Sequence, residues 1–208
     1  MVTFYIVRHG ETLLNSLGRA QGWSDSPLTD NGKMAAKDLG LEIKGTIFHA
    51  AYASDTLRAV QTAEMILSII GNSDIKVQKD MRLREWCLGS MDAEHNTTFI
   101  KVVSDWLGVS AFAELNKRLP DVAAAIYEHD STGMAEPFTA IASRLKGVLE
   151  DIAQNESYNE NGSILVVTHA FAIKTLLYLF APEQLCAVEK VKNVAILRLI
   201  YDEGKFHF

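Results

Sequence analysis

The chain has 208 residues, of which 48% are hydrophobic and 22% are charged, and its formal net charge is −6. The length predicts about one domain, and the composition excludes a disordered, collagen-like or low-complexity chain. The acidic balance argues against nucleic-acid binding and against binding to an anionic membrane surface, because both rely on a spread of cationic charge. An anionic ligand would therefore need positive charge concentrated locally.

No apolar stretch reaches the roughly 20 uninterrupted residues that a membrane span requires. The two longest stretches, residues 170–182 and 191–201, are interrupted by polar or charged side chains. The N-terminal sequence MVTFYIVRHG has neither the basic start nor the apolar run of a signal peptide. Cys87 and Cys186 are therefore expected to be reduced thiols in a cytoplasmic protein.

Short apolar segments alternate with amphipathic ones along the chain. The apolar segments predict strands at residues 2–7, 50–53, 75–79, 164–168 and 194–201. Helical spacing of apolar residues predicts helices at 28–44 with Thr29 as N-cap, from Ser54 or Asp55 to about 70, at 137–152 and at 170–180. Residues 89–136 carry dispersed aromatic residues at helical spacing and predict a helical insertion.

This alternation of strands and helices is typical of an α/β sandwich around a mostly parallel sheet. Segments 2–7 and 164–168 are apolar throughout, as expected for strands that are buried on both faces. In such folds a ligand binds beyond the carboxyl ends of the strands. Chemically unusual residues are therefore expected directly after each strand.

Two histidines, two arginines and a carboxylate occupy such positions. Arg8 and His9 follow the first strand, Arg58 lies one turn beyond the second, Glu85 follows the third, and His169 follows the fourth. Arginine forks bind two phosphate oxygens at once. A neutral imidazole is a competent nucleophile, a protonated one stabilises transition-state charge, and a carboxylic acid protonates a leaving alkoxide and then deprotonates water. This set of residues points to phosphoryl chemistry.

Taken singly, each of these residues is more often structural than functional. A lone histidine after a strand usually has a structural role. Considered alone, Arg58 would be interpreted as a surface residue of an amphipathic helix, and Glu85 as an exposed charge at the end of a strand. Arg82 and Arg84 are expected to be solvated or sheet-edge charges, and Cys87 to be a buried thiol. The histidine and cysteine spacings do not form a metal motif, and no nucleotide-binding glycine loop occurs, so neither a metal nor another cofactor is predicted.

The segments YIVRHGETLLN, QGWSDSPLTDNG, ASDTLRAVQTA, LREWCLG and VVTHAFAIKTLL together resemble the histidine phosphatase superfamily, whose fold is phosphoglycerate-mutase-like. The resemblance implies a three-layer α/β/α sandwich with a mixed, mainly parallel sheet. It also implies a single domain over residues 1–208, in which 89–136 form a variable helical cap over the pocket.

The resemblance also assigns roles by position. The catalytic residues it implies are His9 as the phosphorylated nucleophile, Arg8 and Arg58 as phosphate ligands, His169 as the second pocket histidine and Glu85 as the proton donor. The residues it places at the substrate are Asn15, Gln21, Gly22 and Ala170. Ala170 stands where most members have glycine. Residues 90–94 depart from the family's Glu-Gly pair, so Asp92 or Glu94 is an alternative proton donor.

The predicted function is that of a metal-independent phosphomonoesterase acting through phosphohistidine on a small phosphorylated metabolite. One alternative is a cofactor-dependent phosphoglycerate mutase, although REWCLGSMDAEHN departs from the stretch that such mutases carry. The other is a non-catalytic phospho-ligand-binding module, which would be expected to lack one of the five catalytic residues. Three aromatic residues of the segment 89–136 are expected either to line a substrate cavity or to form the core of the cap, namely Phe99, Trp106 and Phe112. The sequence leaves both the substrate and the oligomeric state open, a homo-oligomer included.

Overall fold

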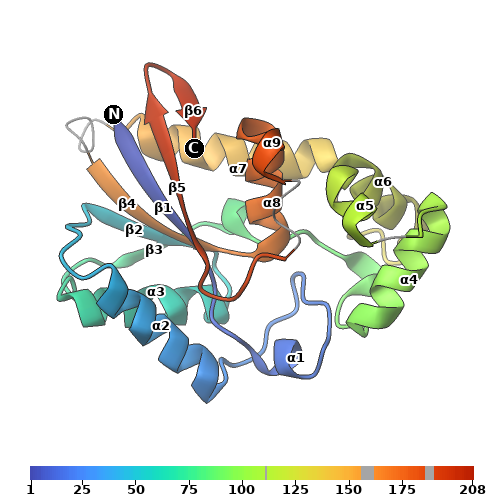
Figure 1. Cartoon of the computed structure of the whole chain (residues 1–208), viewed down its shortest axis with the longest axis horizontal. Coiled ribbons are helices and arrows are strands. Elements are labelled where there is room, and N and C mark those ends of the chain that lie inside the picture. The colour runs from blue at the N-terminus through green and yellow to red at the C-terminus, as the bar shows by residue number, and fades with distance from the viewer. Residues whose placement is uncertain (111, 156–161, 186–189) are drawn as a thin grey trace.

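A computed structural model describes residues 1–110, 112–155, 162–185 and 190–208 (Figure 1). Within these residues a six-stranded sheet has the strand order β3-β2-β4-β1-β5-β6. Its strands are β1 Val2–Arg8, β2 Ala50–Ala53, β3 Val77–Lys79, β4 Gly162–Thr168, β5 Ile196–Asp202 and β6 Lys205–His207. The first four run parallel, whereas β5 is antiparallel to β1 and β6 to β5. The predicted mixed, mainly parallel sheet is therefore confirmed.

Four helices cover the two faces of this sheet. The helices of the described residues are α1 Leu13–Ser16, α2 Asp30–Glu42, α3 Leu57–Ile70, α4 Asn96–Leu107, α5 Phe112–Lys117, α6 Leu119–His129, α7 Phe138–Ala153, α8 Ala170–Phe180 and α9 Pro182–Leu185, with 3₁₀ turns η1 Met81–Leu83 and η2 Gly89–Met91. Figure 1 shows α2 and α3 on one face and α7 and α8 on the other. The three layers of the expected α/β/α sandwich are present.

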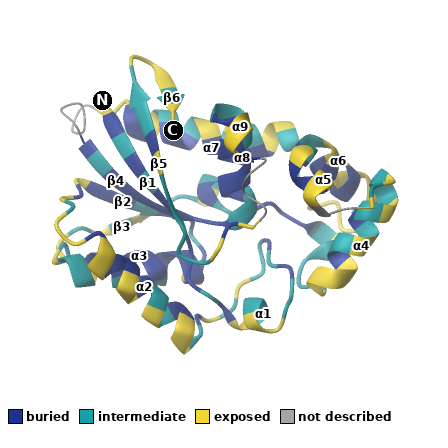
Figure 2. Cartoon of the chain, viewed as in Figure 1, coloured by how far each residue is buried: buried dark blue, intermediate teal, exposed yellow. Residues whose placement is uncertain are grey.

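The central strands bury both of their faces, which explains their continuous apolar sequence. In β4, Ile164 and Val166 pack on the side of α7 and α8, whereas Leu165 and Val167 pack on the side of α2 and α3. All four side chains are fully buried, and Figure 2 shows the middle of the sheet as the buried centre of the chain. Since a parallel strand between two helical layers meets no solvent, apolar residues are favoured at every position.

The N-terminus of α3 differs from the prediction. Thr56 is the N-cap, in place of Ser54 or Asp55, and its side chain makes no capping hydrogen bond. Both predicted caps are engaged elsewhere, because Ser54 Oγ lies 2.7 Å from His169 Nε2 and Asp55 binds Arg84 through both carboxylate oxygens at 2.6 Å. Tertiary contacts have therefore overridden the local capping preference.

The edges of the sheet also differ from the prediction. β3 begins at Val77, because a turn that brings the Ile75 amide to the Asn72 carbonyl precedes it. β5 begins two residues later than expected, since Val194 has φ of 51° and is not extended. The hairpin to β6 was not predicted at all. It turns at Glu203 and Gly204, both of which have positive φ.

Helices α4, α5 and α6 fall within residues 89–136 and lie beside one another at one end of the sheet (Figure 1). Phe99 and Ile126 belong to the same hydrophobic cluster as the sheet and α8. Trp106 stacks on His129 with ring centroids 4.2 Å apart. The side chain of Phe112 lies outside the described residues. The assignment of 89–136 as a cap within a single domain remains a prediction.

In the part of the chain that the structure describes, no helix is long and apolar enough to cross a membrane. Cys87 is a free, buried thiol, and burial raises its pKa. Cys186 lies outside the described residues, so its predicted reduced state remains a prediction.

Candidate active site

The carboxyl ends of β1 and β4 bring two histidines together. The strands pair in parallel with Arg8 opposite Thr168, so that His9 and His169 both lie just beyond the last pair. The His9 amide donates to the Thr168 carbonyl at 3.0 Å, and the two imidazole rings lie 5.1 Å apart between centroids. Parallel pairing thus places residues that are 160 positions apart in one site.

The backbone carbonyl of Gly10 sets the tautomer of His9. His9 Nδ1 lies 2.7 Å from the Gly10 carbonyl oxygen, which can only accept, so Nδ1 carries the proton and Nε2 keeps its lone pair. Burial lowers the pKa of His9 well below its ordinary value, and the charges of Arg58 and Arg8 lower it further. His9 is therefore a neutral imidazole with Nε2 available as a nucleophile.

Gly10 permits the close packing behind His9. A Cβ at this position would lie 2.7 Å from the Gly32 carbonyl oxygen at the start of α2, closer than real Cβ contacts. The Gly10 amide donates to Thr62 Oγ1 at 3.0 Å, and that hydroxyl donates to the Arg58 carbonyl at 2.7 Å. The glycine of the Arg-His-Gly triplet is thus required by the contact between β1, α2 and α3.

Arg58 is held by nearly all of its donors. Its Nη1 donates to the Ser24 carbonyl at 2.7 Å and to Asp25 at 3.0 Å. Its Nη2 donates to the Gly22 carbonyl at 2.7 Å and to His169 Nδ1 at 3.1 Å. Four of the five guanidinium N–H groups are therefore engaged. Burial lowers the pKa of Arg58, and the Asp25 carboxylate opposes that shift.

Two buried donors have no acceptor among the described residues, namely Nε of Arg8 and Nε of Arg58. Arg8 otherwise donates through Nη1 to the Val191 carbonyl at 2.7 Å, and burial lowers its pKa to about 10. A buried donor without a partner costs about 1–3 kcal/mol, and more when it is charged. Two such donors on arginines whose charges both act on His9 suit an anionic ligand.

His169 differs from the expectation of a protonated second imidazole. Its Nδ1 must accept from Arg58, because a guanidinium has no acceptor, and its Nε2 then donates to Ser54 Oγ. Burial and the neighbouring Arg58 charge lower the pKa of His169 well below its ordinary value. In this arrangement His169 is neutral, and the positive charge of the site is carried by the arginines.

Glu85 lies at the N-terminus of α8. Its Oε1 accepts from the amides of Trp86 at 3.0 Å and Ala172 at 2.9 Å, and its Oε2 accepts from Phe171 at 2.9 Å. Burial raises the pKa of Glu85, and these three amide bonds partly oppose the rise. A buried carboxyl group with a raised pKa can hold and release a proton.

A cavity of about 360 Å³ opens beside His9. The predicted residues that line it are Arg8, His9, Asn15, Gln21, Glu85 and Ala170. Arg58 and His169 have no exposed surface and are not in the wall; His169 lies beside His9, and Arg58 donates to His169. Gly22 is not in the wall either, and its carbonyl instead binds Arg58. Of the nine predicted site residues, the structure thus places six in the cavity wall and three outside it.

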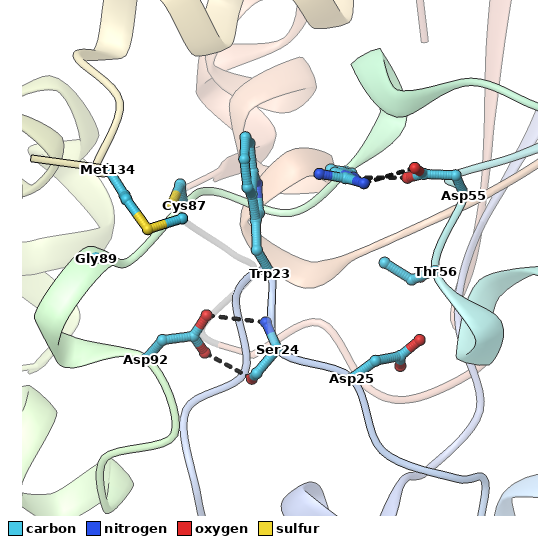
Figure 3. Close-up of a pocket in the computed structure, with 10 residues that line it drawn as sticks. Trp23, Ser24, Asp25, Asp55, Thr56, Cys87, Gly89, Asp92 and Met134 are labelled. Atoms are coloured by element: carbon cyan, nitrogen blue, oxygen red, sulfur yellow. Dashed lines mark hydrogen bonds and ion pairs between the residues drawn. The ribbon is translucent and has the colours of Figure 1, made fainter. Parts of the chain in front are cut away.

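Asp92 lies in a different place from the one its suggested role requires. It lines a second pocket, of about 520 Å³, together with Trp23, Ser24 and Met134 (Figure 3). Its carboxylate accepts hydrogen bonds from the Gly22 and Ser24 amides and from Ser24 Oγ. Neither Asp92 nor Glu94 is among the described residues that line the His9 cavity. Glu85 is therefore the only one of the three candidate proton donors in that wall.

Sequence reasoning missed several residues that build the site. Asn193 Nδ2 donates to the His9 carbonyl at 3.1 Å and to Asn15 Oδ1 at 3.2 Å. Thr62 and Asp25 hold the backbone and the side chain of Arg58. Thr62 stands four residues after Arg58 and could have been found from helical spacing, whereas no local signal marks Asn193.

Within the described residues, no three histidine, cysteine or acidic side chains are grouped as metal ligands would be.

Arg82 and Arg84, which were expected to be solvated or sheet-edge charges, are partly exposed and both form ion pairs. Arg82 pairs with Asp80 and Asp151, and Arg84 pairs with Asp55. Arg84 also lies over the Trp23 ring, 4.8 Å from its centroid.

Residues 4–208 match the family described as histidine phosphatase superfamily (branch 1). The chain belongs to this superfamily. The "Probable phosphoglycerate mutase GpmB" of Erwinia tasmaniensis is 30% identical over 177 residues, which cover 85% of this chain and 74% of that protein. Members of the superfamily are phosphatases and mutases, so this histidine phosphatase homologue is an enzyme of that class.

Solved structures of the superfamily share the fold. A phosphoglycerate mutase from Bacillus anthracis superposes with a TM-score of 0.91 at 32% identity, covering 99% of this chain and 90% of the other. A phosphoserine phosphatase from Entamoeba histolytica, in complex with 3-phosphoglyceric acid, gives a TM-score of 0.73 at 26% identity, covering 99% and 94%. The phosphoglycerate-mutase-like α/β fold predicted from the sequence is confirmed.

Proposed function

We propose that this histidine phosphatase homologue hydrolyses small phosphomonoesters through a phosphohistidine on His9. The observation that carries the proposal is the state of His9, whose Nδ1 is bonded to Gly10 so that Nε2 is a neutral nucleophile in the wall of a cavity. Arg8 lies in the same wall, Arg58 acts on His9 through its charge, and each arginine has a buried Nε donor without an acceptor. A neutral nucleophile close to two cationic side chains suits attack on a phosphoryl group.

The reaction proceeds in two steps. His9 Nε2 forms a bond to phosphorus while the ester P–O bond breaks, and Glu85 gives its proton to the departing alkoxide. Glu85 then takes a proton from water, the water oxygen bonds to phosphorus, and the N–P bond breaks. Inorganic phosphate leaves, and both His9 and Glu85 return to their starting states.

The cavity indicates a small and partly polar substrate. Beyond His9 its wall carries Arg19 and Lys190 as well as the apolar side chains of Phe99, Ile100 and Phe171. With about 360 Å³ it accommodates a metabolite rather than a macromolecule. As the sequence predicts, we propose that the protein is cytoplasmic and that its partner is a small phosphorylated metabolite.

A phosphoglycerate mutase is the second candidate. It is favoured by two of the relatives, the "Probable phosphoglycerate mutase GpmB" of Erwinia tasmaniensis and the phosphoglycerate mutase of Bacillus anthracis. The two reactions share phosphorylation of His9 and differ in what accepts the phosphoryl group. A hydrolase passes it to water, whereas a mutase returns it to a hydroxyl of the substrate.

Release of inorganic phosphate from a panel of aryl and alkyl phosphomonoesters, in the presence of a chelator, tests the proposal. We expect turnover that the chelator does not change, because His9 supplies the nucleophile. A parallel assay follows interconversion of 2- and 3-phosphoglycerate. Interconversion without release of phosphate would contradict the proposal in favour of the mutase, and loss of turnover on chelation would contradict the metal-free mechanism.

The pH dependence of kcat/KM follows from the two shifted pKa values. His9 attacks only when neutral, and its pKa lies well below the ordinary 6.5, so activity should persist below pH 6.5 and fall only at lower pH. Glu85 acts as an acid only when protonated, and its pKa lies above the ordinary 4.5. The fall of kcat/KM with rising pH should therefore occur at a higher pH than an ordinary glutamic acid would give. A pH profile of kcat/KM, corrected for ionisation of the ester, measures both pKa values. An acid limb above pH 6.5 would contradict this assignment.

A further inference from the structure

We propose that Asp92 is a positioning residue that fixes the phosphate-binding geometry of Arg58 by holding the backbone of residues 22–24. The inference rests on the proposed function, because it assigns Arg58 to a phosphoryl group. It gives Asp92, which follows η2 at the start of the segment 89–136, a role other than that of a proton donor.

The Asp92 carboxylate organises the segment 22–24 from one side. Its Oδ1 accepts from the Gly22 amide at 3.0 Å and from Ser24 Oγ at 2.7 Å, and its Oδ2 accepts from the Ser24 amide at 2.9 Å. Figure 3 shows the side chain of Asp92 directed at Ser24, with both residues lining the second pocket.

The carbonyl groups of the same segment hold Arg58 from the other side. The Gly22 and Ser24 carbonyls each accept from one Nη atom of Arg58 at 2.7 Å. With its Nη groups engaged by these carbonyls, Asp25 and His169, the guanidinium has a single direction in which Nε can point. A guanidinium is planar, so its carbonyl partners set the direction of its remaining donor.

The segment has little freedom to adopt another path. A Cβ at Gly22 would lie 2.6 Å from the Trp86 carbonyl oxygen, so this part of the chain is packed tightly against residues 85–88. Trp23 Nε1 donates to the Glu85 carbonyl at 2.9 Å. The segment thus touches both Arg58 and the peptide of the proposed proton donor, and Asp92 acts on the site through it.

Asp130 provides a matched control. Its carboxylate also accepts from backbone amides, those of Ser90, Thr132, Met134 and Ala135, at 2.7 to 2.9 Å. These bonds lie in the same part of the chain, but none reaches the segment 22–24 or Arg58. Asp130→Asn therefore removes a similar local network, which includes one bond to Ser90 of η2 but leaves the bonds from Asp92 to the segment 22–24 in place.

The test measures the affinity of the full chain for inorganic phosphate by calorimetry, and kcat and KM on an aryl phosphate. We expect Asp92→Asn to weaken phosphate affinity roughly ten- to hundredfold, since an amide nitrogen cannot accept from the Ser24 or Gly22 amide and the guanidinium loses its orientation. Asp130→Asn should change phosphate affinity less than about twofold while lowering the melting temperature comparably.

Two outcomes overturn the inference. One is a folded Asp92→Asn with wild-type phosphate affinity, and the other is equal weakening by Asp130→Asn, which would indicate general loosening. If Asp92→Asn does not fold, Ser24→Ala is measured in its place. We expect this variant to bind phosphate about threefold more weakly, and wild-type binding would overturn the inference. Should the wild type bind phosphate without hydrolysing any ester, the proposed function fails, and the phosphate affinities alone decide the role of Asp92.

Discussion

His9→Ala should abolish turnover, lowering kcat/KM by at least about 10⁴-fold, and should leave no phosphorylated protein after incubation with substrate. The reason is that Nε2 of His9 forms the bond to phosphorus, and no other described residue offers an equivalent nucleophile. His169 lies close by, but it has no exposed surface, its Nδ1 accepts from Arg58 and its Nε2 is engaged by Ser54. It cannot replace His9 without giving up at least one of these two contacts.

The measurement combines steady-state hydrolysis with detection of acid-labile phosphate on the protein in rapid-quench samples. His207→Ala is the matched control, since it makes the same change at an exposed position on the edge strand β6. The control should retain wild-type turnover and phosphorylation. Residual turnover by His9→Ala above about one part in a hundred of the wild type would refute attack by this residue.

Glu85→Gln should slow the hydrolysis of alkyl phosphates by about 10²–10⁴-fold and that of aryl phosphates by less than about tenfold. An alkoxide leaves only with a proton, whereas a nitrophenolate leaves without one. The carboxyl group is placed for this role by its position in the cavity wall, and burial raises its pKa so that it can carry a proton.

The aryl substrate serves as the internal control for folding. A glutamine can present one oxygen to the Trp86 and Ala172 amides but cannot accept from Phe171, so some loss of stability is expected. Equal loss on both classes of ester would show that Glu85 only holds the N-terminus of α8. Asp92 would not then become the donor, because its carboxylate lies in the second pocket.

The sequence by itself determined the layers of the fold and the end of the sheet at which the site lies. Apolar periodicity depends on neighbouring residues, so the segments that became β1, β2, β4 and α8 could be located from local pattern. Parallel strands share one carboxyl edge, and the sequence alone therefore predicts that His9 and His169 lie in one place.

Only the tertiary structure decided how those residues are used. The proton on His9, the neutrality of His169 and the direction of the Arg58 guanidinium depend on hydrogen bonds to groups elsewhere in the fold. Asp92 and Ser24 stand 68 residues apart, and no sequence pattern connects them. Long-range hydrogen bonds also explain why Thr56 is the N-cap of α3, because Ser54 and Asp55 bind residues that are distant in the sequence. Local propensity locates the elements, but burial and long-range hydrogen bonds select protonation states and orientations.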